Sequence, residues 1–360
     1  MHTNEPTRQP LRLWPGVVIV LLQWLLRFVV PIIIPEALTV GVMGGLVCGL
    51  GVVVWWGFFS RAPRRERWVA VVLMIVAFVA TSYLVDESIA TAMMGMMLAV
   101  YAFPVLSLAF VIWAVASHRL PEGSRRATMV ATILLACGVW TLVRTGGFTG
   151  DMDNDFAWRW AQTPEERLLA QAGPEPTGLR SVPESAEVVT TWPGFRGPDR
   201  DSIIRGVRIA TDWSESPPVE LWRRPIGPGW SSFAVRGDLI YTQEQRGEDE
   251  VVSCYDVITG EPVWRHRDAA RFWEANAGAG PRATPTLSDG RVYTFGATGI
   301  LNVLDADDGT VVWSRNAATD TGVEIPPWAL AGSPLVVDDA VIVAAAGKLA
   351  SYDLATGTPR

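Results

Sequence analysis

Acidic side chains are the residues of this sequence with the most evident chemical potential, because grouped carboxylates can hold a calcium ion or a cofactor. One group, in a loop-like segment that begins WPGFRGPDRDSIIRG (192–206), consists of Asp199, Asp201 and Asp212. A second group crowds an extended hairpin, QEQRGEDE (243–250), and consists of Glu244, Glu248, Asp249 and Glu250. Turn caps and a solvated loop tip are the favoured interpretations, with metal or cofactor ligands as the alternative.

The longest connection between the expected strands, RHRDAARFWEANAGAGPRATP (265–285), carries a second kind of candidate. Its side chains could line a binding face, because function is often carried by such loops. The candidates are Arg265, His266, Arg267, Arg271, Trp273 and Asn276. Ordinary loop packing is the favoured alternative.

Histidine and cysteine point to no catalytic or metal site. The other histidines, His2 and His118, lie far from His266 in the sequence, so neither a zinc cluster nor a Ser-His-Asp set can be argued. Cys48 and Cys137 fall in apolar stretches, which leaves Cys254 without a disulfide partner. We therefore expect no catalytic residue and no metal ligand.

These candidates lie among copies of one sequence motif, Asp-x-x-x-Gly-x-x-x-Trp. The copies are Asp256–Gly260–Trp264, Asp305–Gly309–Trp313 and, as far as the glycine, Asp353–Gly357. The aspartates are 49 and 48 residues apart, and such a period is typical of stacked repeats. Trp222 stands 42 residues before Trp264, where the last strand of a preceding unit would lie.

The sequence of each repeat predicts four short strands. A first strand follows Thr284–Pro285 or Ser333–Pro334, alternating and apolar strands come next, and the last strand carries the tryptophan. Between the last two strands, aspartate would cap a tight turn and glycine would supply its positive φ. Four-strand units are typical of propeller blades, and the tryptophan would pack between neighbouring blades.

The segments CYDVITGEPVW, LDADDGTVVW and SYDLATG resemble the pyrroloquinoline quinone (PQQ) propeller repeat, over about residues 190–360. The second copy departs from the family pattern, because Asp308 replaces the usual threonine. The resemblance implies a β-propeller in which Trp264 and Trp313 dock against the adjacent blade. The family includes quinoprotein dehydrogenases, which use PQQ with calcium, and a non-enzymatic lipoprotein of the outer-membrane β-barrel assembly machinery.

Two functions stay open on this resemblance. One is a binding or assembly scaffold in the cell envelope, which needs no cofactor. The alternative is a PQQ-dependent dehydrogenase that oxidises a sugar or alcohol and passes electrons to membrane quinone. The sequence has no Cys-Cys pair of the kind found in many of the family's enzymes, and WPGFRGP (192–198) resembles the opening of secreted repeat proteins without an assigned activity. Both observations favour the scaffold.

The first 145 residues are strongly apolar. Stretches long enough, or nearly so, to cross a hydrocarbon core lie at about 13–34, 38–59, 68–85, 92–116 and 127–143. Arg-rich links at 61–67 and 117–126 alternate with links that contain no Lys or Arg. This alternation predicts a multi-pass inner-membrane protein with a cytoplasmic N-terminus and periplasmic repeats.

Gln23 and Arg27 lie four residues apart on one face of the first stretch. An arginine inside a membrane costs about 2.5–3.5 kcal/mol at the centre of a span. It could make a polar contact inside the bundle, to a quinone or a partner subunit. The favoured interpretation is that it reaches outward to the interface.

We expect a transmembrane domain at 1–145, an extracytoplasmic connector at 146–190 and PQQ-type repeats at 191–360. The connector contains a short helix within PEERLLAQAG (164–173) and a Pro-rich linker at 173–187. Its aromatic residues form an interfacial belt or, alternatively, pack on the base of the propeller. They are Phe156, Trp158 and Trp160.

The expected partners are the lipid bilayer and envelope proteins bound through propeller loops. A formal net charge of −7 argues against nucleic acid. The repeats amount to a lone Trp222 strand, two full units and one unit without its last strand, so we expect a partial propeller. Truncation is favoured over closure by another chain or an open arc, since open strand edges invite aggregation.

Overall fold

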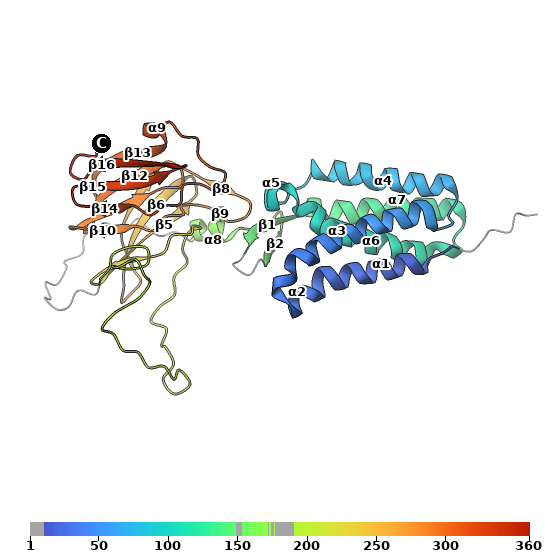
Figure 1. Cartoon of the computed structure of the whole chain (residues 1–360), viewed down its shortest axis with the longest axis horizontal. Helices are drawn as coiled ribbons and strands as arrows, with labels where there is room; N and C mark the ends of the chain where they lie inside the picture. The colour runs from blue at the N-terminus through green and yellow to red at the C-terminus, as the bar shows by residue number, and fades with distance from the viewer. Residues whose placement is uncertain (1–10, 149–152, 172, 174–175, 177–190) are drawn as a thin grey trace, which may run out of the picture. The chain divides into compact units, whose positions relative to one another are not determined.

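The computed structural model describes residues 11–148, 153–171, 173, 176 and 191–360. It divides into two compact units, Met1–Ala161 and Gln162–Arg360 (Figure 1). Most of the Pro-rich linker at 173–187 lies outside the described residues.

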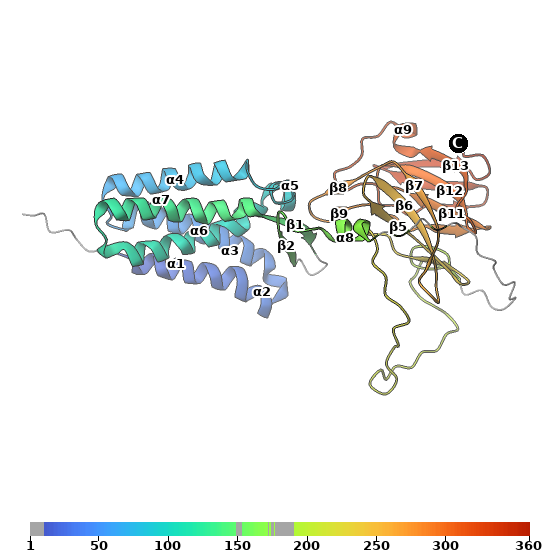
Figure 2. The same ribbon diagram turned by 180° about the vertical axis from the view of Figure 1, so that it is seen from behind.

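The N-terminal unit is a bundle of apolar helices, whose long members lie side by side (Figures 1 and 2). In chain order its helical segments are α1 (Trp14–Trp24), the π-helical turn η1 (Leu25–Val29), α2 (Val30–Ile33), η2 (Pro35–Ala37), α3 (Leu38–Val54), η3 (Trp55–Phe59), α4 (Arg64–Ser82), α5 (Glu87–Thr91), η4 (Ala92–Gly95), α6 (Met97–Ala116), η5 (Ser117–Arg119), α7 (Glu122–Gly138) and η6 (Val139–Leu142).

Four stretches of these helices are long and apolar enough to cross a membrane. They are Trp14–Ile33, Pro35–Phe59, Met97–Arg119 and Glu122–Leu142. The third stretch expected from the sequence reaches this standard only when α4 is joined to Glu87–Gly95, from which it is bent by 113°. Asp86 caps the N-terminus of α5, the helix after the bend, because its Oδ1 accepts a hydrogen bond from Ser88 N at 3.1 Å. The described helices therefore offer four spans, or five if the bent pair counts as one.

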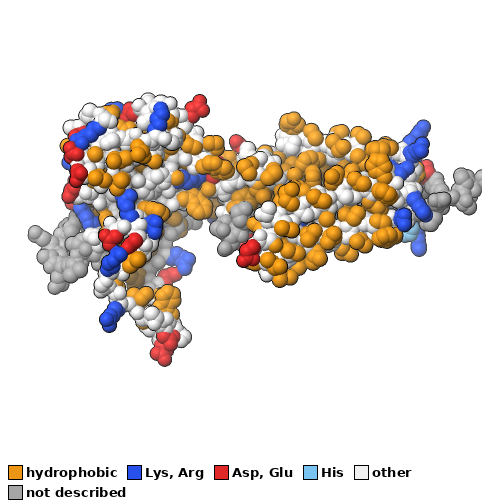
Figure 3. Space-filling model, viewed as in Figure 1, with side chains coloured by type: hydrophobic (Ala, Val, Ile, Leu, Met, Phe, Trp, Pro, Cys, Tyr) orange, Lys and Arg blue, Asp and Glu red, His pale blue; other side chains and the backbone are white. Residues whose placement is uncertain are grey.

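Apolar side chains cover most of the visible surface of the helical unit, and basic side chains gather at one end of it (Figure 3). Leu21, Val47 and Leu135, for example, are exposed. A large exposed apolar surface is unusual for a protein in water. The surface of this unit is compatible with association with a membrane.

The sequence does not predict the hairpin that follows this bundle. Strand β1 (Val143–Phe148) pairs with β2 (Asn154–Trp158). The ring of Phe156 lies 5.3 Å from Tyr101 and 6.1 Å from Trp140. Phe156 therefore packs within the helical unit, whereas the rings of Trp158 and Trp160 stack on each other at 5.2 Å and are exposed.

The C-terminal unit consists of antiparallel sheets with two short helices, α8 (Pro164–Ala170) and α9 (Ala317–Thr321). The first sheet has the order β3 (Thr191–Trp192), β4 (Ala234–Arg236), β5 (Leu239–Arg246), β6 (Asp249–Asp256) and β7 (Pro262–Asp268). The second has β10 (Thr286–Ser288), β11 (Arg291–Phe295), β12 (Ile300–Asp305) and β13 (Val311–Asn316). The third has β14 (Leu335–Val337), β15 (Ala340–Ala345) and β16 (Lys348–Asp353), and a small hairpin joins β8 (Trp273–Glu274) to β9 (Gly278–Ala279).

Neighbouring strands of each sheet follow one another in the sequence, as the repeat predicts. The three sheets adjoin through β4, the second strand of the first sheet, and through β10 and β14, the first strands of the other two, because β4 contacts β10 and β10 contacts β14. One expectation is wrong: Trp222 lies in an extended segment that belongs to none of the strands in the described part of the chain. A strand needs a hydrogen-bonding neighbour, and the described residues place none beside Trp222.

Candidate binding face and repeat junctions

The Asp-x-x-x-Gly motif forms the same turn in all three of its copies. Oδ1 of Asp256 accepts from the backbone N–H groups of Ile258 and Thr259, at 2.9 and 2.7 Å. Asp353 does the same for Ala355 and Thr356, at 3.1 and 2.9 Å. The glycines Gly260, Gly309 and Gly357 have φ values of +69°, +76° and +69°, a conformation that costs other residues energy.

Each tryptophan binds the turn of the following repeat. The indole N–H groups of Trp222, Trp264 and Trp313 donate to the carbonyls of Val257, Ala306 and Leu354, at 2.8, 3.1 and 3.1 Å. Each acceptor is the residue directly after the turn's aspartate. Each ring also lies against the glycine of that turn, which leaves no room for a Cβ: one built on Gly309 would lie 2.5 Å from the ring of Trp264.

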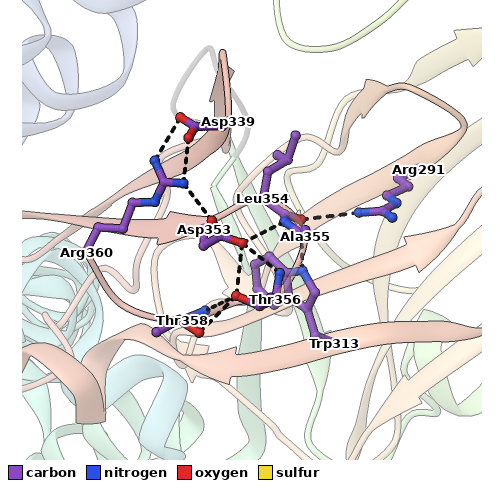
Figure 4. A network of polar contacts seen from close by, with 9 residues as sticks. All are labelled: Arg291, Trp313, Asp339, Asp353, Leu354, Ala355, Thr356, Thr358 and Arg360. Carbon is purple, nitrogen blue, oxygen red and sulfur yellow. Dashed lines mark hydrogen bonds and ion pairs between the residues drawn. The ribbon is translucent and has the colours of Figure 1, made fainter.

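Figure 4 shows the last of these junctions, where Trp313 meets the turn of Asp353. Here Arg291 also donates to the carbonyl of Leu354, at 3.2 Å. On the far side of the turn, Arg360 binds Asp339 at 2.7 Å and Asp353 at 2.6 Å. The hydrogen bond from Arg360, together with those from the backbone and side chain of Thr356, lowers the pKa of Asp353 to about 2. The turn is therefore fixed by aromatic packing on one side and by ion pairs on the other.

A second series of bonds joins the sheets near β4, β10 and β14. Ser232 N donates to Thr284 Oγ1 at 3.1 Å, and Thr284 N donates to Ser333 Oγ at 3.0 Å. Thr286, the first residue of β10, donates its hydroxyl to the carbonyl of Pro334 at 2.7 Å. The Thr-Pro and Ser-Pro pairs singled out in the sequence thus occupy equivalent positions at successive sheet junctions.

Only some of the candidate side chains of the connection 265–285 lie close together. Arg271 forms two bonds to Glu165 of α8, at 2.9 and 3.0 Å. The imidazole of His266 lies 3.3 Å from Asp268. Asn276 lies in the β8–β9 turn, where its backbone N–H donates to Glu274 at 2.7 Å. The β8 residue Trp273 is partly exposed, at 38%. Arg265 is half-buried on β7.

Two acidic residues near this connection are buried, although the sequence predicts a solvated loop tip. Glu244 is fully buried and accepts from Gly227 N at 2.6 Å, Ser253 Oγ at 2.5 Å and Tyr255 OH at 2.9 Å. Glu250 is 4% exposed, and its Oε1 accepts from Ala297 N at 3.0 Å. The prediction holds for Glu248, which is exposed. Glu244 and Glu250 are buried because strands β5 and β6 are covered by chain segments far away in sequence.

An exposed apolar segment precedes the first sheet. Residues 203–221 are all described and contain neither helix nor strand. Their large apolar side chains are between 52% and 81% exposed, and they are Ile203, Ile204, Val207, Ile209, Trp213, Val219 and Leu221. In Figure 1 this stretch lies in the long yellow-green loop that leaves the sheets. We refer to residues 203–221 as the exposed arm.

Comparison with known proteins agrees with the repeat. Residues 208–360 match the family model described as "Outer membrane protein assembly factor BamB". The protein of that name from Shewanella oneidensis is 29% identical over 151 residues, which are 39% of this chain and 35% of the relative. The C-terminal unit carries PQQ-type repeats. The chain thus spans about a third of the length of that curated relative.

Two solved structures resemble part of these PQQ-type repeats. A europium-containing methanol dehydrogenase is 18% identical, with 37% of this chain and 24% of that chain covered and a TM-score of 0.30. BamB from Moraxella catarrhalis is 20% identical, with 37% of this chain and 50% of that chain covered and a TM-score of 0.23.

The three aspartates that the sequence offers as ligands before the first full repeat already have protein partners. Arg205 binds Asp199 at 2.6 Å and Asp201 at 2.5 Å, and it holds the pKa of Asp201 below its usual value. Asp212 accepts from Ser214 N at 3.0 Å. Among the described residues, no group of three or more His, Cys, Asp or Glu side chains could hold a metal ion. Asp199, Asp201 and Asp212 therefore all accept hydrogen bonds from protein donors in this structure.

The contact between glycine and indole gives a direct test of the repeat junction. Gly309→Ala is expected to destabilise the C-terminal unit more than Gly322→Ala. Both glycines have positive φ, +76° and +63°, but a Cβ at position 322 would meet nothing within 4 Å. The control should lose about 1–2 kcal/mol from backbone strain alone, and Gly309→Ala should lose at least 1 kcal/mol more because an overpacked site must shift (about 1–3 kcal/mol). Urea-dependent proteolysis of the full chain in detergent measures both, and equal losses would contradict the contact.

Proposed function

We propose that this chain is a membrane-anchored scaffold of the cell envelope, whose PQQ-type repeats form part of a β-propeller that binds other envelope proteins. The observation that carries the proposal is the exposed arm. Seven large apolar side chains that are more than half exposed are more than a water-soluble unit usually shows in one stretch, and such surfaces mark sites of protein interaction.

The arrangement of the sheets supports a propeller. Strands β4, β10 and β14 of the successive sheets adjoin one another, and each tryptophan on a last strand binds the turn of the next repeat. A fan of this kind has its first strands nearest the centre and its tryptophans between the sheets. The assembly role in the name of the matched family gives a precedent for a scaffold. The partner would then be an envelope protein that contacts the repeats and the arm.

The basic residues of the helical unit support the placement of the two units across a membrane. Basic residues cluster where α3 leads to α4 and where α6 leads to α7: Arg61 precedes α4, Arg64 and Arg65 begin it, Arg119 ends η5 and Arg126 lies in the first turns of α7. Basic links of this kind usually stay in the cytoplasm. We propose that this end of the bundle is cytoplasmic and that the repeats are periplasmic.

A photo-reactive amino acid at Val219 or Leu221 of the full chain tests the proposal in the native host. The scaffold hypothesis expects one discrete cross-linked envelope protein from both positions. The control position is Val312 on β13, which is also apolar and exposed, at 41%. Val207→Asp with Ile209→Asp should then reduce the cross-link from Leu221 while the amount of chain in the membrane stays the same.

Two results would overturn the scaffold. The first is an identical pattern of cross-links from Val312 and from the arm. The second is turnover of a sugar or alcohol by the purified chain after addition of PQQ and calcium, followed by dye reduction, which would establish the dehydrogenase instead.

A further inference from the structure

The helical unit contains a buried arginine that has no acidic partner among the residues described. Arg27 belongs to the π-helical turn η1 and is 7% exposed. Its side chain lies against α3, because a Cβ added to Gly45 would be 3.5 Å from the Arg27 side chain. The arginine therefore points into the bundle, which differs from the favoured expectation that it reaches outward. Gly41, Gly45 and Gly49 are buried on α3 at intervals of four, and they allow this close approach.

The surroundings of the guanidinium are aromatic. Its central carbon lies 4.8 Å from the ring centre of Tyr101 and 5.1 Å from that of Phe28. In the described part of the chain, Arg27 Nε has no hydrogen-bond partner. A guanidinium has five N–H donors and no acceptor, and the aromatic faces leave at least the Nε–H donor of Arg27 unpaired within the described residues.

Two further polar groups near Arg27 have a free acceptor. Gln23 is fully buried and donates its amide to the carbonyl of Gly45 at 2.8 Å, while its Oε1 has no partner among the described residues. Asn154 donates to the hydroxyl of Tyr101, and its Oδ1 is likewise unpartnered there. The positive charge of Arg27 is thus bordered by polar groups, and no carboxylate of the described residues pairs with it; Asp86, at the same end of the bundle, binds Arg159 at 3.2 Å.

An apolar groove of about 280 Å³ begins one helical turn deeper in the unit. Its walls come from α3, α4 and α6, and they include Leu50, Phe78, Leu106 and Phe110. Gly49 and Phe103 line the groove. A Cβ at Gly49 would also lie 3.2 Å from the amide nitrogen of Gln23. The same part of α3 therefore borders the groove on one side and the polar residues on the other.

We propose that this region binds a phospholipid, with its phosphate at Arg27 and one acyl chain in the groove. A buried cation needs an anionic acceptor, because an unpaired charge in a low-dielectric site is very costly. Phosphate oxygens match the fork of N–H groups on arginine. A neutral quinone carbonyl could accept one hydrogen bond but would leave the charge unbalanced, so the charge favours a phosphate.

The direction of the helices agrees with this placement. From Arg27, six residues of η1 and α2 lead to Ile33, the end of the first span, which is about 9 Å at 1.5 Å per residue. A phosphate at Arg27 would therefore lie in the outer third of the span Trp14–Ile33, and the lipid headgroup would be drawn into the bundle from that end. The groove runs from Phe103 to Phe110 along α6, away from that end, as an acyl chain would.

The test uses the full chain, delipidated in a neutral detergent, with native mass spectrometry to count bound molecules. The probes are dioctanoyl phosphatidylglycerol, dioctanoylglycerol with the same chains but no phosphate, inorganic phosphate and decylubiquinone. We expect the phosphatidylglycerol to bind at least tenfold more tightly than the other three. Arg27→Gln should weaken its binding about tenfold or more, and Arg27→Lys should restore part of the loss because the charge returns.

A second pair of variants keeps the proposal testable if Arg27→Gln does not fold. Val79→Trp should fill the groove and weaken phosphatidylglycerol binding several-fold, because Val79 lines it. Val72→Trp is the matched control, since Val72 is equally exposed on α4 but does not line the groove; the two are 47% and 56% exposed. The proposal is overturned if dioctanoylglycerol or decylubiquinone binds as tightly as phosphatidylglycerol, if phosphate alone does so, or if the Val79→Trp and Val72→Trp proteins behave alike.

Discussion

Replacing Trp264 with alanine is expected to lower the free energy of unfolding of the C-terminal unit by about 3–5 kcal/mol. The side chain is 2% exposed and among the largest that are almost fully buried. It packs on the glycine of the next turn, lies 5.9 Å from the ring of Tyr241 and donates to Ala306. The substitution removes the largest apolar side chain between the first two sheets and leaves a cavity there. It also leaves the carbonyl of Ala306 with only the hydroxyl of Tyr241, at 3.0 Å.

Proteolysis of the full chain in detergent, as a function of urea concentration, measures the loss for this unit. Trp273→Ala is the matched control, because Trp273 is 38% exposed and should cost less than about 1 kcal/mol. Trp222→Ala should fall between the two, since Trp222 makes the same bond to a turn but is only half-buried. If Trp264→Ala cost no more than Trp273→Ala, the tryptophan would not be what joins the repeats.

The repeat junction could be predicted from the sequence because its determinants are local. Aspartate, glycine and tryptophan lie within nine residues of one another, and each has a specific task in a turn and the strand that follows. The period of 49 and 48 residues then places the next copy of the turn beside each tryptophan. The contacts of Trp264 with Gly309 and of Trp313 with Gly357 follow from this arrangement.

Features that depend on distant segments could not be predicted in this way. Glu244 and Glu250 stand in a charged hairpin whose composition resembles that of a solvated loop. Their burial depends on Gly227 and Ala297, residues that belong to other parts of the fold. The pairing of β1 with β2 and the site around Arg27 likewise depend on how the helices pack against one another, which the local sequence does not specify. The spans were easier to predict, because length and apolar composition suffice.

The buried carboxyl of Glu250 gives the second large effect, a dependence of stability on pH. Burial raises the pKa of Glu250 from 4.5 to about 7, and the nearby Asp268 adds to the shift. The N–H of Ala297 and the charge of Arg282 lower the pKa, but each of these effects is weaker than the effect of burial. Oε2 of Glu250 has no partner among the described residues, and a Cβ on Gly296 would lie 2.2 Å from it. The ionised form is thus poorly solvated in the folded chain.

The sign of the effect follows from proton linkage. Between pH 4.5 and about 7 the folded state keeps the Glu250 proton more often than the unfolded state does, so stability falls as pH rises through this window. At 1.36 kcal/mol per pKa unit, the loss is on the order of 3 kcal/mol. Below the window the contribution of this group is fully present, and above it no further change is expected from Glu250.

Glu250→Gln should remove this part of the pH dependence, because glutamine stays neutral. Relative to the unmodified chain, the variant should therefore become more stable as pH rises from 4.5 to 7, by up to about 3 kcal/mol. The difference between the two chains at each pH cancels the titration of all other groups that they share. Glu248→Gln is the matched control, since Glu248 is exposed in the same hairpin and should show a difference that does not change with pH. A constant difference for Glu250→Gln as well would mean that Glu250 is solvated in the folded chain, so the β11–β12 turn of the second sheet would not cover Glu250 as the structure shows.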